Sequence, residues 1–414
     1  MYNTNSNFLR GDQIMKKILA IVLAALMVFA LASCGAENPT PDAGGKDAAP
    51  AGEKVVKIGV FEPASGDNGA GGKQETLGIQ YANEKTPTVK IGDDEYKVEV
   101  IYADNGSSND KAPTAAQSLI SAGCSIILGS YGSGVSIAAS DTFKDSGVAA
   151  IGVTCTNPQV TEGNSHYFRI CFLDPFQGTV LANLASSEFK ASKAYILTKL
   201  GDDYSTGLGY NFKQAFEALG GTVVEESFQE GNADFTAFLN TAKSQECDVI
   251  FAPTSTEAAQ LIIEQSATQG IAVPLLAGDT WDSNVILNAA KGKDVKIYVT
   301  TFYQEGGNAD FDNGFKDWIN ADATHLSNNG GDDTVAAVSA MGYDAYYVAL
   351  EAIKAAGSAD KAAIKNVLGS VTYTGVTGEI KFDETGDAIR DTAYVKTANT
   401  ETGAWDFVRE QGVN

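Results

Sequence analysis

From Val55 onward the chain alternates short runs of apolar, largely β-branched residues with longer stretches of helical periodicity. We predict buried strands over residues 55–61, 96–103, 125–128 and 148–152, with helices over residues 73–84, 114–121 and 135–144. Helical stretches this close to apolar strands indicate βαβ units and a parallel sheet. Strands with polar alternation are scarce, as expected for a sheet that is covered on both faces.

A second series of the same kind begins after Phe172-Leu173-Asp174-Pro175. Its predicted strands cover residues 194–198, 222–228, 248–252, 275–277 and 296–301, and its helices cover residues 176–189, 207–219, 235–242 and 257–269. The tail adds helices over residues 311–320 and 335–356 and short strands over residues 379–382 and 392–395. The pattern predicts an α/β protein with two doubly wound, Rossmann-like lobes. Ligands of such sheets bind at the carboxyl ends of the strands, so the loops that follow the strands are the candidate site.

The first fifty residues have a different pattern. A basic start at Met15-Lys16-Lys17 leads into an apolar run at 18–31, which is shorter than the roughly 20 residues that span a bilayer. This is typical of a secretory signal peptide over residues 1–33, with Met15 as the expected start. The segment Leu31-Ala32-Ser33-Cys34 resembles the bacterial lipobox, which implies cleavage before Cys34 and a lipid on its sulfur. The alternative is an ordinary signal peptide with a chance cysteine.

Residues 34–53 are rich in Ala, Gly, Pro and Asp and lack apolar periodicity, so we expect them to form a flexible tether. No second apolar run is long enough for a transmembrane helix, so membrane attachment is expected to depend on the lipid alone.

Composition excludes several classes of function. The formal net charge is -23, with 52 acidic against 29 basic residues, which argues against nucleic acid as a partner. Only His166 and His325 are available, and the cysteines form no C-x-x-C pair, so neither a zinc site nor another metal or cofactor is expected. Beyond Cys34, the cysteines resemble small core residues, and the sequence assigns no disulfide to Cys124, Cys155, Cys171 and Cys247.

Three loops after predicted strands of the first series are rich in glycine and hydroxyl residues and carry no charge. They cover residues 63–66, 129–134 and 152–158. Free amides at a helix start attract an anion, and a neutral cradle of amides and hydroxyls suits one carboxylate. The alternative for each loop is ordinary turn chemistry. A phosphate-binding GxxxxGK[ST] or GxGxxG loop is missing, so we do not predict nucleotide binding.

The second series places acidic and aromatic residues in the loops at 202–204, 254–257 and 278–282. A carboxylate here would meet an ammonium group presented from the other lobe, and Asp279 is the predicted one. Asp282 and Glu257 are instead predicted to be helix N-terminal residues that the helix dipole favours.

From about Val55 to its end, the chain resembles the leucine/isoleucine/valine-binding family of ABC importers. The matching segments are P-A-S-G at 63–66, G-S-Y-G-S at 129–133, T-x-T-N-P at 154–158, D-D-Y at 202–204, A-G-D-T-W-D at 277–282 and G-Y-D-A at 342–345. Each segment is weak alone, but their order and spacing are specific. The resemblance implies the type I periplasmic-binding fold, with two lobes joined by three crossings around a ligand cleft. Lobe 1 would comprise residues 54–173 and 303–391, and lobe 2 would comprise residues 174–302 and 392–414.

The resemblance also implies roles for individual residues. Ser133, Thr154 and Thr156 would hold a ligand carboxylate, and Asp279 would pair with the α-ammonium group. The remaining expected ligand-binding residues are Tyr204, Thr254 and Ser255 beside the ammonium group, Tyr131 and Trp281 around the ligand side chain, and Gly132, Cys155 and Ser65 from the same loops.

The chain departs from the family pattern at two loops. Residues 69–72 include three glycines where an aromatic residue is frequent, and residues 254–256 are Thr-Ser-Thr where a tyrosine is frequent. The pocket is therefore expected to be more open, or to accept a larger or more polar side chain.

The implied function is capture of an amino acid, most often a branched-chain one, by hinge closure and its delivery to a membrane permease. Three alternatives remain: the same fold with an amide, short peptide or aromatic acid as ligand; a ligand-sensing module for a membrane receptor; and an extracellular hydrolase. The hydrolase would need His166 or His325 beside a nucleophile, and neither adjoins a G-x-S-x-G elbow, so the protein is not expected to be an enzyme.

Overall fold

The computed structural model describes residues 54–413. The predicted signal peptide, the lipid site at Cys34 and the tether up to residue 53 lie outside the described residues. Within residues 54–413, no helix combines the length and apolar character needed to cross a membrane.

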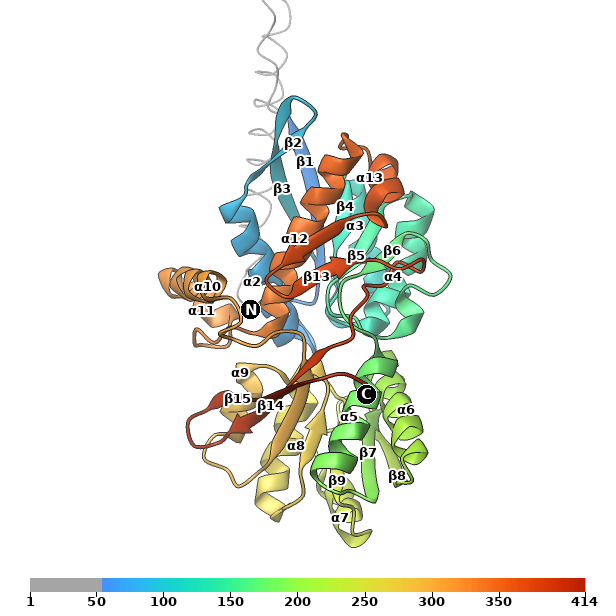
Figure 1. Cartoon of the computed structure of the whole chain (residues 1–414), viewed down its shortest axis with the longest axis vertical. Helices are drawn as coiled ribbons and strands as arrows, with labels where there is room; N and C mark the ends of the chain where they lie inside the picture. The colour runs from blue at the N-terminus through green and yellow to red at the C-terminus, as the bar shows by residue number, and fades with distance from the viewer. Residues whose placement is uncertain (1–53, 414) are drawn as a thin grey trace, which may run out of the picture. The chain divides into compact units, whose positions relative to one another are not determined.

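The first sheet has six strands in the order β2-β3-β1-β4-β5-β6. They are β1 (Val55–Glu62), β2 (Thr88–Ile91), β3 (Asp94–Asp104), β4 (Ile126–Leu128), β5 (Ala149–Gly152) and β6 (Tyr167–Arg169). All neighbours pair in parallel except β2 with β3. The helices of this lobe are α2 (Gly69–Lys85), α3 (Ala112–Ser121), α4 (Ser133–Ser146), α12 (Ala337–Ala356) and α13 (Lys361–Leu368). Helices α2 and α12 pack side by side although they lie far apart in the sequence (Figure 1).

The second sheet has seven strands in the order β15-β14-β11-β10-β9-β7-β8. They are β7 (Lys193–Lys199), β8 (Thr222–Phe228), β9 (Val249–Phe251), β10 (Leu275–Ala277), β11 (Ile297–Thr301), β14 (Ala393–Asn399) and β15 (Ala404–Gln411). The last two strands are antiparallel additions to a parallel sheet. Its helices are α5 (Asp174–Glu188), α6 (Asp203–Ala218), α7 (Thr236–Ser244), α8 (Thr256–Gln269) and α9 (Asn284–Ala290).

The chain passes between the two lobes three times, after β6, after β11 and before β14. The second crossing leads into α10 (Ala309–Ala321) and α11 (Ala323–Asn328), and a hairpin of β12 (Thr372–Gly375) and β13 (Gly378–Lys381) precedes the third. The prediction of two doubly wound α/β lobes joined by three crossings is confirmed. In Figure 1 the red strands β14 and β15 lie beside the yellow part of the second sheet, which shows the return of the chain.

The core strands carry the burial pattern that the apolar runs predict. Strand β1 is buried from Ile58 to Glu62, and β4, β5 and β9 are buried throughout, because helices cover both faces of each sheet. The elements that the sequence did not indicate are β2, β12, β15, α9, α11 and α13. Several of these, such as β15, are short or half-exposed edge elements, where an apolar pattern is weak.

Two glycines allow α2 and α12 to approach backbone to backbone. A Cβ added at Gly78 would lie 1.8 Å from the Ser339 carbonyl oxygen, and one at Gly342 would lie 2.2 Å from the Glu75 carbonyl oxygen. The close contact fixes α2 against the lobe. It therefore also fixes the side chains that α2 directs toward the carboxyl ends of the strands.

Candidate ligand-binding site

The loop after β4 ends at the N-terminus of α4, and Ser133 is the first residue of that helix. Gly132 precedes it in an extended conformation, which turns the chain from the strand into the helix. The buried Ser133 hydroxyl accepts a hydrogen bond from the Asn157 amide at 3.2 Å. The first amides of a helix have no partner within the helix, so this loop presents donors suited to an anion.

The loop after β5 places Thr154, Cys155 and Thr156 in the buried interior. The Thr154 hydroxyl donates to the Glu75 carboxylate, so its proton is directed away from a ligand and only its lone pairs remain available. This differs from the hydroxyl-to-carboxylate contact that the resemblance implies for Thr154. Thr156 lies beside Asp174: burial raises the pKa of Asp174 to about 8, although the Thr156 hydroxyl works in the opposite direction.

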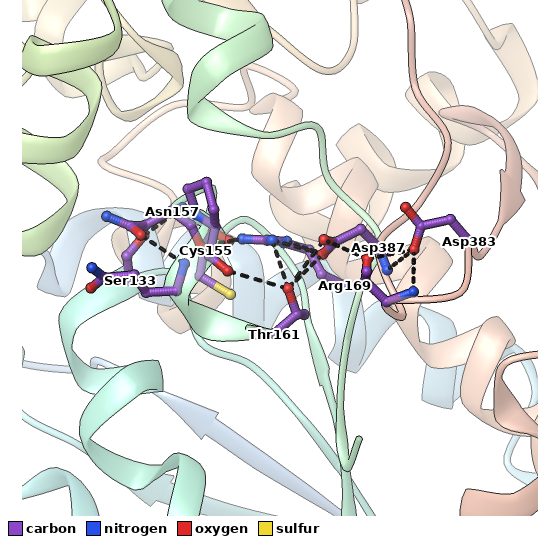
Figure 2. A network of polar contacts seen from close by, with 10 residues as sticks. Ser133, Cys155, Asn157, Thr161, Arg169, Asp383 and Asp387 are labelled. Carbon is purple, nitrogen blue, oxygen red and sulfur yellow. Dashed lines mark hydrogen bonds and ion pairs between the residues drawn. The ribbon is translucent and has the colours of Figure 1, made fainter. Parts of the chain in front are cut away.

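A buried arginine sets the shape of this loop (Figure 2). Arg169, at the end of β6, donates from Nη1 to the Cys155 and Asn157 carbonyl oxygens at 2.9 and 2.5 Å. Its Nε lies 2.8 Å from Asp387, a residue of the third crossing, and Nη2 reaches the Thr161 hydroxyl at 3.1 Å. The arginine therefore connects the loop that carries Thr154 and Thr156 to the segment through which the chain leaves the first lobe.

Asp279 lies on the opposite wall of the cleft, in a 3-10 turn (Asp279–Trp281) that follows β10. Its Oδ1 accepts hydrogen bonds from Gln177 Nε2 at 3.0 Å and from the Tyr204 hydroxyl at 3.3 Å. Burial raises the pKa of Asp279 to about 7, and the Gln177 hydrogen bond partly opposes this effect. The predicted partners Tyr204 and Asp279 are thus brought together.

Other predicted residues form hydrogen bonds with neighbouring residues of their own lobe. Trp281 is fully buried in the core of the second lobe, and its Nε1 donates to the Thr254 hydroxyl at 3.3 Å. Ser255 caps α8 by accepting from the Ala258 amide. Ser65 is exposed and donates to Asp104 Oδ2 at 2.7 Å, so it lies at the rim and away from Ser133 and Asp279.

The predicted role of Asp282 as a helix N-terminal residue is wrong. Ser283 caps α9 instead, and the Asp282 carboxylate forms a buried ion pair with Lys396 at 2.9 Å. The Thr301 hydroxyl donates to the same oxygen at 2.5 Å. Lys396 belongs to β14, about a hundred residues farther along, so no local pattern could indicate the pair. Glu257, by contrast, lies in the first turn of α8 as predicted.

Several contacts join the two lobes across the cleft. The Tyr131 hydroxyl donates to the Thr280 carbonyl oxygen at 3.2 Å, and Asn157 Nδ2 donates to the Asp203 carbonyl oxygen at 2.7 Å. The ion pair Lys199–Asp67 has a distance of 2.6 Å, and Gln74 Nε2 lies 2.9 Å from Asn284 Oδ1.

A cavity of ≈ 40 Å³ remains between the two walls, with room for a few water molecules. Its lining includes Tyr131, Gly132 and Ser133 from one lobe and Tyr204, Ser255 and Thr280 from the other. A cleft closed to this extent must open to admit an amino acid.

Sequence reasoning missed two buried carboxyl groups beside this cavity. Glu62 is the last residue of β1, and its Oε2 accepts from the Tyr131 amide at 2.7 Å. Glu75 lies in α2 and accepts from Thr154. Burial raises the pKa of Glu75 to about 7 and raises that of Glu62 well above its ordinary value, helped by the neighbouring Glu75. An acidic residue at the end of the apolar run VVKIGVFE was the available signal.

The four cysteines in the described part of the chain are buried free thiols. Cys124, Cys171 and Cys247 belong to the hydrophobic cores, as predicted. Cys155 lies within the loop that Arg169 contacts, and its carbonyl oxygen is one of the two in this loop that accept from Arg169.

A family model described as "Periplasmic binding protein" matches residues 55–403. Among curated proteins, the chain is 28% identical over 335 residues to the Leu/Ile/Val-binding protein homolog 1 of Brucella suis biovar 1, a match that covers 80% of this chain and 87% of that protein.

Solved structures with the same fold include a leucine-binding protein, LivK, from Thermotoga maritima, with a TM-score of 0.75 and 32% identity over 86% of this chain and 99% of that one. LivJ from Streptococcus pneumoniae, in complex with isoleucine, has a TM-score of 0.74 and 25% identity over 87% of this chain and 99% of that one. A solute-binding protein from R. palustris in complex with benzoate has a TM-score of 0.73 and covers 86% of this chain and 96% of that one, but at 19% identity it shows the fold alone.

Proposed function

This chain belongs to the periplasmic binding protein family, and on that premise we propose that it captures an amino acid for an ABC importer. The proposed ligand is a branched-chain or other aliphatic amino acid, in line with the Leu/Ile/Val-binding homologue and the leucine- and isoleucine-binding structural relatives. A membrane permease would receive the ligand from the closed form.

One observation carries the proposal: the two walls of a single cleft have complementary chemistry. The first lobe offers the Ser133 hydroxyl, the start of α4 and the loop of Thr156. The second lobe offers the buried carboxylate of Asp279 with the Tyr204 hydroxyl beside it. A zwitterion matches this pair, because its carboxylate suits the neutral donors and its ammonium group suits the carboxylate.

Hinge closure follows from the distribution of these groups over two lobes. A ligand that contacts both walls binds the closed form better than the open form and so shifts the population toward closure. The three crossings are the segments that would absorb the movement, with the boundaries of lobe 1 at 54–173 and 303–391 and of lobe 2 at 174–302 and 392–414.

Anchoring by a lipid on Cys34 completes the proposal. A protein that delivers ligand to a permease gains from being held near the membrane surface, and a tether over residues 35–53 would allow the binding unit to reach it. Mass spectrometry of the protein extracted from membranes would test the modification, and a Cys34→Ala variant should be released in soluble form.

Calorimetric titration of the chain that starts after Cys34, stripped of prebound ligand and measured against the twenty amino acids, tests the function. Binding of aliphatic amino acids at micromolar or lower Kd is expected. The variant Asp279→Ala should bind about 2–5 kcal/mol more weakly, the range for removing one partner of a buried charge pair. Asp294→Ala, which removes an exposed carboxylate from the same lobe, is the matched control. Equal affinity in both variants would refute the role of Asp279.

Binding should also weaken as the pH falls below about 7. Burial raises the pKa of Asp279 to about 7, so below this pH a growing fraction of the ligand-free protein carries a neutral carboxyl that attracts an ammonium group less. Because the ammonium group favours the carboxylate, binding near pH 7 should release protons. A Kd that does not rise between pH 7.5 and pH 5.5 would contradict this expectation.

A further inference from the structure

The Glu62–Glu75 pair lies directly behind the two binding loops of the first lobe. Glu62 accepts a hydrogen bond from the Tyr131 amide of one loop, and Glu75 accepts one from the Thr154 hydroxyl of the other. The two carboxyl groups are neighbours, and each keeps one buried oxygen, Oε1, without a hydrogen-bond partner within residues 54–413. Burial raises the pKa of Glu75 to about 7, and burial together with the neighbouring Glu75 raises that of Glu62 well above its ordinary value, so near pH 7 Glu75 is the group that carries the negative charge.

No basic side chain forms an ion pair with this charge. Within residues 54–413, neither Glu62 nor Glu75 belongs to an ion pair, and their hydrogen bonds come from the Tyr131 amide and the Ser130 and Thr154 hydroxyls. The buried bases Arg169 and Lys396 are bound to Asp387 and Asp282. A buried carboxylate without a cation is costly, and a ligand that brings one would relieve this cost.

The pair is in electrostatic contact with the side of the cleft that carries Asp279. Tyr131 connects the two regions: its ring packs against Gly71 of α2, where a Cβ would lie 2.4 Å from it, and its hydroxyl reaches the Thr280 carbonyl oxygen. The Tyr204 hydroxyl contacts both Thr280 and Asp279. The charge of Asp279 acts on Glu75, and the charges of both act on the Tyr131 hydroxyl.

We propose that Glu75, whose buried Oε1 has no hydrogen-bond partner within residues 54–413, is a second anchor for the ligand's ammonium group, placed on the first lobe opposite Asp279. The Thr154 oxygen belongs to the same anchor, because it donates to Glu75 and has only lone pairs left to accept from an ammonium group. The proposal rests on the proposed function, since it concerns the same cleft. It makes the ammonium group the feature by which the site selects its ligands.

This arrangement has two consequences. A carboxylate without an ammonium group would bring a second negative charge toward Glu75 and Asp279, so it should be rejected. An ammonium group should also draw a proton out of the acid pair. The titratable groups that face Glu75 are Glu62 from β1, Tyr131 after β4, Cys155 after β5 and Asp279 from the second lobe. Of these, the pKa values of Tyr131 and Cys155 lie too high for them to release protons near pH 7.

The test compares leucine with 4-methylpentanoate, which is leucine without its ammonium group, by calorimetric titration at pH 7. The variants are Glu75→Gln and Glu62→Gln, and the matched control is Glu99→Gln, an exposed carboxylate on β3 of the same lobe. Glu75→Gln should weaken leucine binding by about 10–100-fold, the range for a hydrogen bond to a charged group. The preference for leucine over 4-methylpentanoate should fall by a similar factor, and Glu99→Gln should change neither value.

Proton release gives a second measure. Titrations in two buffers of different ionisation enthalpy should show protons released on leucine binding, and because Asp279 also contributes, the share of Glu75 is the difference between the wild type and Glu75→Gln. If Glu75→Gln does not fold, as judged by thermal unfolding, the same comparison of affinity and proton release between the wild type and Glu62→Gln decides.

Failure of the second anchor and failure of the proposed function would give different results. Leucine binding that is equally tight in the wild type, Glu62→Gln and Glu75→Gln would overturn the second anchor and leave the proposed function intact. Wild-type protein that binds 4-methylpentanoate as tightly as leucine would overturn the second anchor and also the pairing of the ammonium group with Asp279. A wild-type protein that binds no amino acid would overturn the proposed function, and the second anchor with it.

Discussion

Each lobe contains one buried ion pair, and the cations of the two pairs differ in how many other groups they bind. In the first lobe Arg169 pairs with Asp387 and also holds the Cys155 and Asn157 carbonyl oxygens. In the second lobe Lys396 pairs with Asp282, and within residues 54–413 its Nζ has no other hydrogen bond. Each pair includes a residue near the third crossing, and each involves a loop of the candidate site: Asp282 belongs to one, and Arg169 donates to the other.

The difference follows from the two cationic groups. The guanidinium is planar and has five donors, so one arginine can bind a carboxylate and several carbonyl oxygens at once. The ammonium group of lysine acts as a point charge. The first-lobe loop, whose cradle is neutral, depends on Arg169 for its shape, whereas the second-lobe loop is already held by its own turn and by Gln177 and Tyr204. We therefore expect the two pairs to contribute unequally to stability and to binding.

Removal of Arg169 should have the largest effect. Arg169→Met leaves two carbonyl oxygens without their donor and the Asp387 carboxylate without its cation, with only hydroxyl donors left, and we expect a loss of about 3–5 kcal/mol in the free energy of unfolding, measured with urea. Ligand affinity should fall as well, because the loop of Thr154 and Thr156 loses its support. Arg409→Met, which breaks a half-exposed pair with Glu188, is the control and should cost less than about 1 kcal/mol. Equal losses in the two variants would contradict the comparison.

Removal of Lys396 should have a smaller effect. Lys396→Met leaves Asp282 with the Thr301 hydroxyl and free to take up a proton, so we expect a loss of about 2–3 kcal/mol in the free energy of unfolding. The Kd for leucine should change by less than about threefold, since Asp279 keeps its own partners. A loss of affinity as large as that of Arg169→Met would show that the two loops depend equally on their ion pairs.

The Thr161 hydroxyl is a third partner of the Arg169–Asp387 ion pair, and its removal tests how much it contributes. It accepts from Arg169 Nη2 and donates to Asp387, so Thr161→Val should reduce the free energy of unfolding by about 1–2 kcal/mol while the ion pair remains. Thr268→Val removes a hydroxyl that bonds only locally, to the Glu264 carbonyl oxygen on α8, and should be close to neutral. A neutral Thr161→Val would mean that Arg169 and Asp387 need no third partner.

A third ion pair, Lys199–Asp67, joins the lobes at the mouth of the cleft and should have the smallest effect. It is partly exposed, so Lys199→Gln should weaken ligand binding by less than about 1 kcal/mol. The effect should shrink as salt is raised, because exposed charges are screened. Titrations at low and high ionic strength check both points, and a salt-independent loss would assign Lys199 a role other than this pair.

The sequence predicted the elements that have a strong local pattern. The half-exposed strand 222–228 and the buried strand 275–277 were predicted at their observed bounds, and the loops after β4, β5 and β10 were predicted as the candidate site. The tertiary structure was needed for every partner that lies far away in the chain. Arg169 lies 218 residues from Asp387, and nothing beside it in the sequence indicates that it organises the ligand loop.

The sequence by itself determined the alternation of apolar strands and helices, and with it two α/β lobes and the glycine- and hydroxyl-rich loops at their strand ends, because hydrophobic period and turn chemistry are local properties. Only the tertiary structure decided that Glu62 faces Glu75, that Thr154 donates its proton away from the cleft, and that Asp282 belongs to Lys396. The physical reason is that a charge or a hydrogen-bond donor acts through space. Its effect depends on burial and on the groups around it, which the fold brings together from distant parts of the chain.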